Sequence, residues 1–377
     1  MAGIYIHVPF CKQRCRYCSF FSSTNEKKKG EYIDALCTEL QTRKDYIESD
    51  IIETIYIGGG TPSTLQKEDF EKIFSTIERN FIIKEGAEIT LETNPDDLSR
   101  EYLAMLRSLP FNRLSMGVQS FNDNLLKRLG RRHDANRAIE AFRDARVTGF
   151  KNISIDLMFA LPGSTDESWS NDLETAIRLR PEHISAYNLT YEEGTSLYKA
   201  MQSGEIVPLD EEENLKQFTT LIERLDTAGY RHYEISNFAL PGHESRHNSS
   251  YWHDTPYLGC GAAAHSYDGA SRQWNVANID LYIKGIKEGM PDYEIEKLTE
   301  SECYNDAILT RLRTYDGLPI EWFRNKFQNK YITYMLNSAA KHIARGTLTH
   351  DSDDCIKLTK KGIFISDAII RDLIYVD

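Results

Sequence analysis

The first half of the chain repeats one pattern, a short run of β-branched and aromatic residues followed by a longer amphipathic stretch. Each repeat takes roughly 30 residues, the length of a strand–crossover unit. Strands that alternate with helices pair in parallel through right-handed crossovers. Six units are too few for a closed eight-stranded barrel, so the pattern predicts an α/β fold, a partial, open (β/α)6 barrel, with ligands at the carboxyl ends of its strands. The expected strands are Ile4–Val8, Thr54–Ile57, Glu88–Glu92, Arg113–Val118, Ile153–Phe159 and His183–Leu189, and the expected helices between them are Gly30–Tyr46, Lys67–Asn80, Ser99–Arg107, Asp134–Thr148 and Glu167–Leu179.

The rest of the chain predicts two further regions. The segment Asp210–Thr227 has a further helical pattern, and we expect the barrel domain to span residues 1–229. Residues 230–295 form a connecting region whose first part, Tyr230–Asn275, is rich in His and aromatic residues and weakly periodic, and a loop that long is usually functional. Residues 296–377 are mostly helical, with a hairpin-like piece at Leu348–Thr359 and a last helix at Lys361–Leu373. This pattern resembles a small winged-helix domain.

Charge and composition narrow the classes of partner. The formal net charge is −12, and residues 296–377 hold equal numbers of basic and acidic residues, so we expect no nucleic-acid partner even for a winged helix. No apolar run approaches the roughly 20 residues that a membrane span needs. The first residues lack the basic segment and the cleavage site of a signal peptide. We therefore expect a cytoplasmic protein.

The most specific motif is Cys11-Lys-Gln-Arg-Cys15-Arg-Tyr-Cys18, directly after the first strand. Three of the seven cysteines within eight positions indicate a metal site in a reducing compartment. Three thiolates on one loop can hold three corners of a [4Fe–4S] cluster and leave the fourth iron open to another ligand. The alternative is a zinc site with His7 or a distant cysteine as fourth ligand.

Polar or glycine residues follow the later strands at the same edge of the sheet. Gly58-Gly-Gly-Thr-Pro62 ends the second strand, and consecutive glycines let the backbone approach a ligand closely. Glu92 offers a carboxylate for ribose hydroxyls, and an arginine such as Arg131 can pair with the carboxylate of a zwitterionic ligand. Taken alone, the glycine run equally fits an ordinary tight turn, and each of the polar residues fits a salt bridge at the barrel rim. Gln119 and Asp156 continue the series at the ends of later strands.

The order of these motifs resembles the radical-SAM superfamily, in the branch of oxygen-independent coproporphyrinogen III oxidase and its heme-chaperone relatives. The resemblance covers essentially the whole chain and implies a radical-SAM barrel with a [4Fe–4S] cluster and S-adenosylmethionine (SAM). It implies that Tyr5 lies near the SAM methionine, that Tyr17 packs on the adenine and that the glycine run positions the amino group. The SAM-binding residues implied are Tyr5, Tyr17, Gly59, Gly60, Thr61, Glu92, Gln119, Arg131, Asp156 and Thr190.

A further motif, Arg246-His-Asn-Ser-Ser-Tyr-Trp252, lies in the connecting region. Imidazole is a common axial ligand of heme iron, and aromatic rings stack on porphyrins. A lone histidine in a loop is more often simply hydrogen bonded. The motif resembles the HNxxYW run of the heme-chaperone branch, which implies heme binding by His247, Tyr251 and Trp252. His243, His253 and His265 lie nearby, which leaves the choice of ligand open.

Two departures from the oxidase pattern favour the chaperone branch. Ser19-Phe20-Phe21 follows Cys18 where the oxidase has a further cysteine, and the oxidase carries a long N-terminal extension before its cluster motif. The resemblance therefore implies a heme chaperone that delivers heme to acceptor hemoproteins such as respiratory enzymes, with an electron donor for its cluster. The alternatives are coproporphyrinogen III oxidase and a radical-SAM enzyme acting on another substrate.

Overall fold

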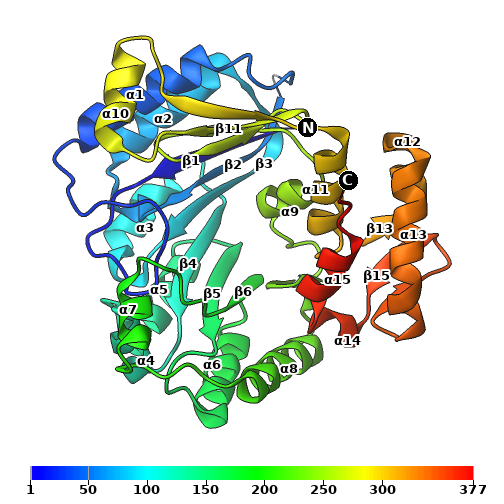
Figure 1. The fold of residues 1–377 in the computed structure, drawn as a ribbon. Helices are drawn as coiled ribbons and strands as arrows, with labels where there is room; N and C mark the ends of the chain where they lie inside the picture. The colour runs from blue at the N-terminus through cyan, green and yellow to red at the C-terminus, as the bar shows by residue number, and fades with distance from the viewer. Residues whose placement is uncertain (1, 50, 377) are drawn as a thin grey trace.

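Six parallel strands form the centre of the molecule (Figure 1). The computed structural model describes residues 2–49 and 51–376. The six strands pair side by side in chain order, each in parallel with the next. This arrangement confirms the predicted α/β radical-SAM-type barrel and puts six strand ends at one edge. The strands are β1 (Gly3–Val8), β2 (Ile51–Gly59), β3 (Ile82–Thr93), β4 (Arg113–Gln119), β5 (Ile153–Phe159) and β6 (His183–Asn188).

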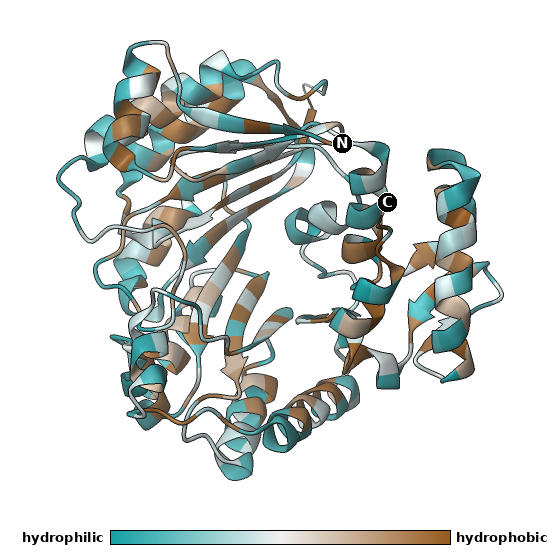
Figure 2. Cartoon of the chain, viewed as in Figure 1, coloured by the Kyte–Doolittle hydropathy of each residue, from teal (hydrophilic) through white to brown (hydrophobic). Residues whose placement is uncertain are grey.

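Amphipathic helices cover the outer face of these strands, with their polar sides turned to solvent (Figure 2). Helix α2, for example, buries Phe70, Ile73, Phe74 and Ile77 on one side and begins with a capping box at Gln66, which satisfies its first backbone N–H groups. Apolar spacing of three and four residues produces that buried stripe. The outer helices are α1 (Lys29–Thr42), α2 (Lys67–Asn80), α3 (Arg100–Arg107), α5 (Ala135–Val147), α6 (Asp166–Leu179) and α8 (Glu211–Thr227), and the shorter α4 (Asp123–Leu129) and α7 (Ser196–Gln202) lie beside strand ends.

The region expected to be loop-rich instead extends the sheet at both edges, to twelve strands. Strand β9 pairs with β1 in parallel, and β10, β11 and β12 follow it in antiparallel order. Most of these strands have three to five residues, too few to show a period in sequence. The added elements are β7 (Arg231–Glu234), β8 (Asn237–Ala239), α9 (Arg246–Trp252), β9 (Tyr257–Cys260), β10 (His265–Tyr267), β11 (Ser271–Asn275), α10 (Ile279–Lys287) and β12 (Tyr293–Lys297).

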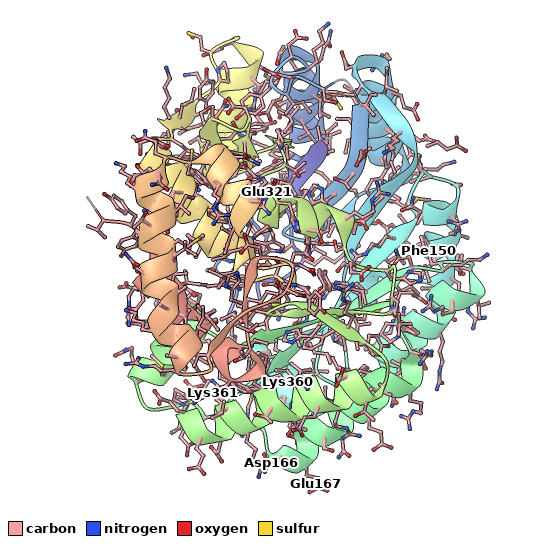
Figure 3. All side chains as sticks on the ribbon, turned by 90° about the vertical axis from the view of Figure 1, so that its right-hand side faces the viewer. Phe150, Asp166, Glu167, Glu321, Lys360 and Lys361 are labelled. Atoms are coloured by element: carbon pink, nitrogen blue, oxygen red, sulfur yellow. The ribbon has the colours of Figure 1, made fainter. Side chains whose placement is uncertain are left out.

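The C-terminal segment has a hydrophobic core of its own, formed between Tyr304 and Leu373. A three-stranded antiparallel sheet packs beside its helices, as a winged-helix-like unit does. The last helix, expected to be continuous, is broken near Ile365 into two pieces. Figure 3 looks onto this unit, with Lys360 close to helix α8. Its elements are α11 (Glu300–Arg311), β13 (Leu318–Pro319), α12 (Ile320–Lys326), α13 (Asn329–Ala344), β14 (Leu348–His350), β15 (Cys355–Leu358), α14 (Lys360–Ile363) and α15 (Ser366–Leu373).

The division of the chain at residues 229 and 295 stays a prediction, and strand β12 spans the second of these boundaries. The main core runs from Ala2 to Ile286 and joins the barrel strands to the added strands and α10. Among the described helices, none combines the length and the apolar character that a membrane crossing requires.

Candidate functional site

A pocket of about 590 Å³ lies at the carboxyl ends of the parallel strands, where open α/β sheets bind their ligands. The loop after β1 forms one wall, and residues from the ends of β2 to β6 form the rest. The pocket gathers all three motif cysteines with nine of the ten residues expected at SAM. These twelve are Cys11, Cys15, Cys18, Tyr17, Gly59, Gly60, Thr61, Glu92, Gln119, Arg131, Asp156 and Thr190.

The cysteine loop folds so that two sulfur atoms receive hydrogen bonds from the pocket wall. Thr61 Oγ1 donates to Cys11 Sγ at 3.3 Å, and Arg131 Nη1 donates to Cys15 Sγ at 3.3 Å. Burial raises the pKa of the Cys11 and Cys18 thiols, so bound iron is what would hold these two as thiolates.

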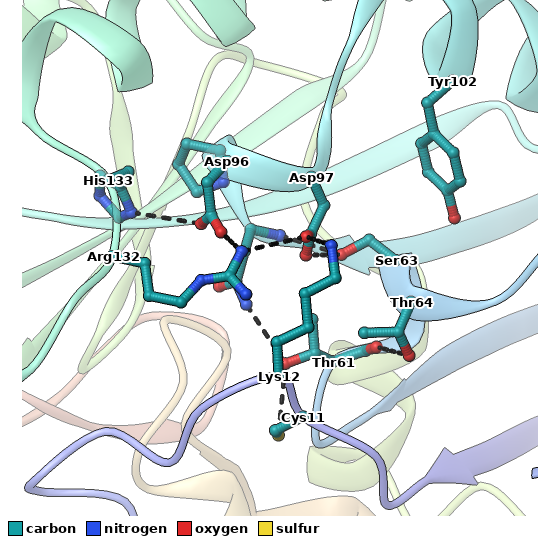
Figure 4. Close-up of polar contacts among 12 residues, drawn as sticks. Cys11, Lys12, Thr61, Ser63, Thr64, Asp96, Asp97, Tyr102, Arg132 and His133 are labelled. Atoms are coloured by element: carbon teal, nitrogen blue, oxygen red, sulfur yellow. Dashed lines mark hydrogen bonds and ion pairs between the residues drawn. The ribbon is translucent and has the colours of Figure 1, made fainter. Parts of the chain in front are cut away.

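A buried carboxylate, Asp97, ties the cysteine loop to the neighbouring turns (Figure 4). Lys12 Nζ lies 2.7 Å from Asp97 Oδ1, and Arg132 Nη2 lies 3.3 Å from the same oxygen. Ser63 Oγ donates to the other oxygen at 2.9 Å. The Asp97 side chain is 2% exposed, so these contacts act in a weakly screened setting. They fix the loop that carries the cysteines against the turn that follows the glycine run.

The glycine run lets the backbone of β2 pass very close to its neighbours. A Cβ atom on Gly60 would lie 2.9 Å from Cys11 Sγ, and one on Gly58 would lie 2.8 Å from the carboxyl carbon of Glu92. Gly59 has a φ of +112°, which side chains rarely adopt. The run is therefore required by close packing against both the cysteine loop and the acidic residue.

Glu92 sits inside the pocket with both carboxylate oxygens hydrogen bonded. Tyr56 donates to Oε1 at 2.8 Å, and the Gly59 amide donates to Oε2 at 3.0 Å. Burial raises the pKa of Glu92 to about 7 despite these bonds, and burial likewise raises the pKa of Asp156 to about 6. Neither acid forms an ion pair with a described residue, although Arg113 acts on both at longer range. Such acids favour a ligand that brings positive charge or hydrogen-bond donors.

Arg131 links the cysteine loop to the strand ends. Its Nη2 donates to Asn94 Oδ1 and to the Gly117 carbonyl, both at 2.6 Å. Gln119, at the end of β4, has a φ of +69°, and the register between β4 and β5 shifts at that point. Such backbone strain in a non-glycine residue tends to be kept at functional sites.

The donor set fits an iron–sulfur cluster better than zinc. His7, the expected fourth zinc ligand, has both ring nitrogens occupied: Nδ1 pairs with the Tyr5 hydroxyl at 3.0 Å, and Nε2 with the Phe21 carbonyl at 3.0 Å. Among the described residues, no three His, Cys, Asp or Glu side chains converge where a single ion would sit. A cluster takes its three thiolates at separate corners.

Tyr5 lines a different pocket from the other expected SAM residues. This second pocket has about 670 Å³ and also contains Tyr251 and Trp252 in its wall. Its two sides are the added strands β9 to β11 and helix α11 of the C-terminal unit. Tyr5 belongs to this wall because its hydroxyl pairs with His7 and its ring stacks near His247. Two of the three residues expected at heme thus meet here.

His247 itself is completely buried. Its Nδ1 pairs with Thr54 Oγ1 at 2.8 Å, and its Nε2 pairs with the Tyr251 hydroxyl at 2.8 Å. Burial lowers the pKa of His247 to about 3, so the ring is neutral. Its expected role as an iron ligand stays a prediction, and it would require the ring to give up the bond to Tyr251.

Comparison with known proteins agrees with this geometry. Residues 5–176 match the model of the radical SAM superfamily. The chain is 36% identical to the heme chaperone HemW of Bacillus subtilis over 98% of both chains. The chain belongs to the heme-chaperone branch of the radical SAM superfamily. Heme chaperone HemW of Mycobacterium tuberculosis is 31% identical, over 99% of this chain and 94% of its own.

The fold of this radical SAM chain also matches a solved structure. Coproporphyrinogen III oxidase (HemN) from Escherichia coli superposes with a TM-score of 0.85, over 99% of this chain and 90% of that one. At 24% identity the match speaks for the fold alone. Radical SAM family membership implies SAM and a [4Fe–4S] cluster, which suits the twelve residues of the first pocket.

Sequence reasoning missed several residues of the cluster pocket. Asn94 bonds Arg131 and also donates to Thr61 Oγ1 at 3.2 Å. Its place two positions after Glu92, at the same strand end, was a usable signal. Tyr187 and Met158 also line the pocket, and nothing in their local sequence marks them.

Proposed function

We propose that this chain is a cytoplasmic heme chaperone that holds a [4Fe–4S] cluster on Cys11, Cys15 and Cys18 and binds SAM beside it. The observation that supports this most directly is the single pocket that gathers three thiols with residues from five successive strand ends. When bound, such a cluster supplies an open iron site for SAM and a route for one electron. Thiolate ligands need a reducing compartment, which is why the cytoplasm is part of the proposal.

The chain's own residues divide the work of holding SAM. Arg131, already bonded to Cys15, has the charge to pair with the SAM carboxylate. Glu92 has the carboxylate for ribose hydroxyls, and Gly59, Gly60 and Thr61 are the proposed contacts of the amino group. The remaining expected contacts are Tyr17, Gln119, Asp156 and Thr190, all in the same wall. Tyr5 is separated from them and suits the second pocket.

Heme is the proposed cargo, and acceptor hemoproteins such as respiratory enzymes are the proposed recipients. Tyr251 and Trp252 support this part, because they line an aromatic pocket of a size that suits a large planar ligand. An electron donor for the cluster completes the proposed set of partners.

The cluster proposal is tested by anaerobic reconstitution followed by metal analysis. We expect about four irons per chain, and replacement of Cys11, Cys15 and Cys18 by Ala should remove them. Cys37→Ala is the matched control, because this buried thiol lies in the core away from the pocket. Stoichiometric zinc without iron would contradict the proposal.

The function proposal is tested by two parallel assays on the reconstituted protein. Heme titration should give a saturable change in the Soret band, whereas coproporphyrinogen III supplied with SAM and a reductant should stay unconverted. Conversion at many turnovers would establish the oxidase alternative instead. If the protein neither binds heme nor converts coproporphyrinogen III, the result would indicate a radical-SAM enzyme with another substrate.

A further inference from the structure

The second pocket has the lining of a porphyrin site. Its volume of about 670 Å³ falls in the usual range for sites of large organic ligands. Tyr5, Phe20, Tyr251, Trp252 and Tyr257 supply aromatic surface to its wall. Phe20 is 68% exposed and lies in the same wall, so its ring adds to the apolar surface that the pocket offers a ligand.

Two histidines line this pocket, and they differ in whether their ring nitrogens are free to bind a ligand. His7 has both ring nitrogens hydrogen bonded. His265, on strand β10, is exposed and has no hydrogen bond from its ring to any described residue. Its ring stacks on Trp274, the residue opposite it on β11, with 5.9 Å between centroids. The imidazole is thus oriented by packing while its nitrogens stay open.

Two arginines also line this pocket, and they differ in whether their guanidinium is already paired with a carboxylate. Arg272 is paired with Asp306 and lies 3.6 Å from Glu296. Arg311, at the end of helix α11, is only 8% exposed, and its guanidinium has no ion pair or hydrogen bond to a described residue. Its guanidinium lies 3.7 Å above the Trp322 ring. Asp316 acts on this guanidinium only at longer range, without a direct ion pair. A buried cation without a directly paired anion is costly, so the site favours an anionic ligand.

A second donor in the same wall points to the same ligand group. The indole N–H of Trp252 is buried and finds no acceptor among the described residues. Buried polar groups without partners are rare in folded proteins, so each one calls for a ligand or a solvent molecule. A guanidinium and an indole N–H are both donors, and a carboxylate is the acceptor that suits them.

We infer that this pocket is the heme site, with the His265 imidazole as axial iron ligand and Arg311 as the counter-ion of a heme propionate. The inference rests on the proposed chaperone function and deepens it. It gives His247 a positioning role, because that ring holds the Tyr251 hydroxyl at 2.8 Å and so fixes the Tyr251 ring in the wall. Heme matches the three features at once: a planar apolar body, an iron that takes imidazole, and carboxylates at one edge.

The heme pocket adjoins the cluster pocket. Ser19 and Phe20, directly after Cys18, line both. The chain between Cys18 and Phe21 is therefore the wall between the proposed cluster and the proposed heme. Phe21 is itself tied to His7 through its carbonyl oxygen, which anchors this wall to strand β1.

The ligand is tested by titrating the full-length reconstituted protein with hemin and, separately, with iron-free protoporphyrin IX. We expect His265→Ala to change the Soret band and to weaken hemin binding about tenfold or more. Binding of protoporphyrin IX should be unchanged, because it has no iron to coordinate. Free imidazole added to His265→Ala should restore the spectrum. His350→Ala, on the hairpin of the C-terminal unit, is the surface control.

The counter-ion is tested with hemin and its dimethyl ester. Arg311→Gln should weaken hemin binding about tenfold or more, while wild type and variant should bind the ester alike. Iron content of the cluster and the unfolding temperature check that the variant is folded. Arg324→Gln, an exposed arginine of helix α12, is the matched control.

The results separate the inference from the function on which it rests. If wild type binds no heme, the chaperone proposal fails. If wild type binds heme but His265→Ala keeps the wild-type spectrum and affinity, the ligand assignment is overturned while the chaperone proposal stands. If His247→Ala abolishes the iron–imidazole spectrum while His265→Ala keeps it, and protoporphyrin IX binding is unaffected in both, then His247 is the ligand and our assignment is wrong.

Discussion

At the scale of single residues, Glu92 gives the cluster pocket a pH dependence. Burial raises the pKa of Glu92 from 4.5 to about 7, so the folded protein binds this proton more tightly than the unfolded chain does. Stability contributed by the protonated acid is full below about pH 4.5 and is lost as the pH rises through about 7. We expect the free energy of unfolding, measured with urea in the absence of SAM, to fall between pH 5 and 8 by up to roughly 3 kcal/mol more in wild type than in Glu92→Gln.

The Glu92→Gln variant keeps the side-chain size, its Oε1 can still accept from the Gly59 amide, and its Nε2 can donate to the Tyr56 hydroxyl oxygen, so it resembles the protonated acid and cannot become charged. Asp156, with its pKa raised by burial to about 6, titrates in both proteins and is coupled to Glu92, so the difference between the two pH profiles reports the Glu92 charge together with that coupling. Equal pH profiles for the two proteins would show that Glu92 stays charged when the pocket holds no ligand.

At the scale of elements, the cysteine loop depends on the turns beside it more than on its own hydrogen bonds. Asp97 joins Lys12 of the loop to Ser63 and Arg132 of two other segments. Asp97→Ala leaves these partners without a buried anion, so we expect a loss of about 1–3 kcal/mol in the free energy of unfolding. Reconstituted iron should also fall, because the loop no longer holds its cysteines in one arrangement.

A matched control for Asp97 is Asp144→Ala. Asp144 pairs with Arg100 on the outer helices, where the arginine is 73% exposed. Such pairs contribute at most about 1 kcal/mol, and iron content should not change. A similar loss of iron in both variants would mean that global stability, and not the loop contact, decides cluster retention.

At the scale of the whole molecule, a buried carboxylate on β7 is one of the contacts that join the C-terminal unit to the sheet. Glu234 on β7 accepts a hydrogen bond from Arg313, which follows helix α11, at 3.3 Å. It also accepts one from Asn237 at 2.6 Å. Because α11 forms a wall of the second pocket, this contact also sets that pocket's shape. Glu234→Gln should cost about 1–3 kcal/mol and speed hydrogen exchange in α11, measured by mass spectrometry.

The Asp226–Lys360 contact offers the comparison for Glu234. It joins the same two parts of the molecule at 4.0 Å, but both side chains are more than two-thirds exposed, at 72% and 83%. Asp226→Ala should therefore leave stability and exchange in α11 nearly unchanged. Faster hydrogen exchange of α11 in both variants would show that exposed ion pairs hold the C-terminal unit as much as the buried Glu234 contact does.

Local sequence determined much of this protein. The spacing of apolar residues in Lys67–Asn80 and the short apolar run of Ile153–Phe159 predicted one helix and one strand with the bounds observed. Both follow from local periodicity and capping, which the chain reveals without its tertiary neighbours. The cysteine motif and the glycine run were visible for the same reason, because their chemistry lies within a few consecutive residues.

Only the tertiary structure decided the rest. The strands β9 to β11 have three to five residues each, so their place in the sheet depends on partners such as β1, far away in sequence. The same is true of which imidazole can bind a ligand. The sequence motif favoured His247 over His265, but in the folded chain both ring nitrogens of His247 are hydrogen bonded. Whether a side chain is free to bind depends on which distant groups already satisfy it, and no local pattern records that.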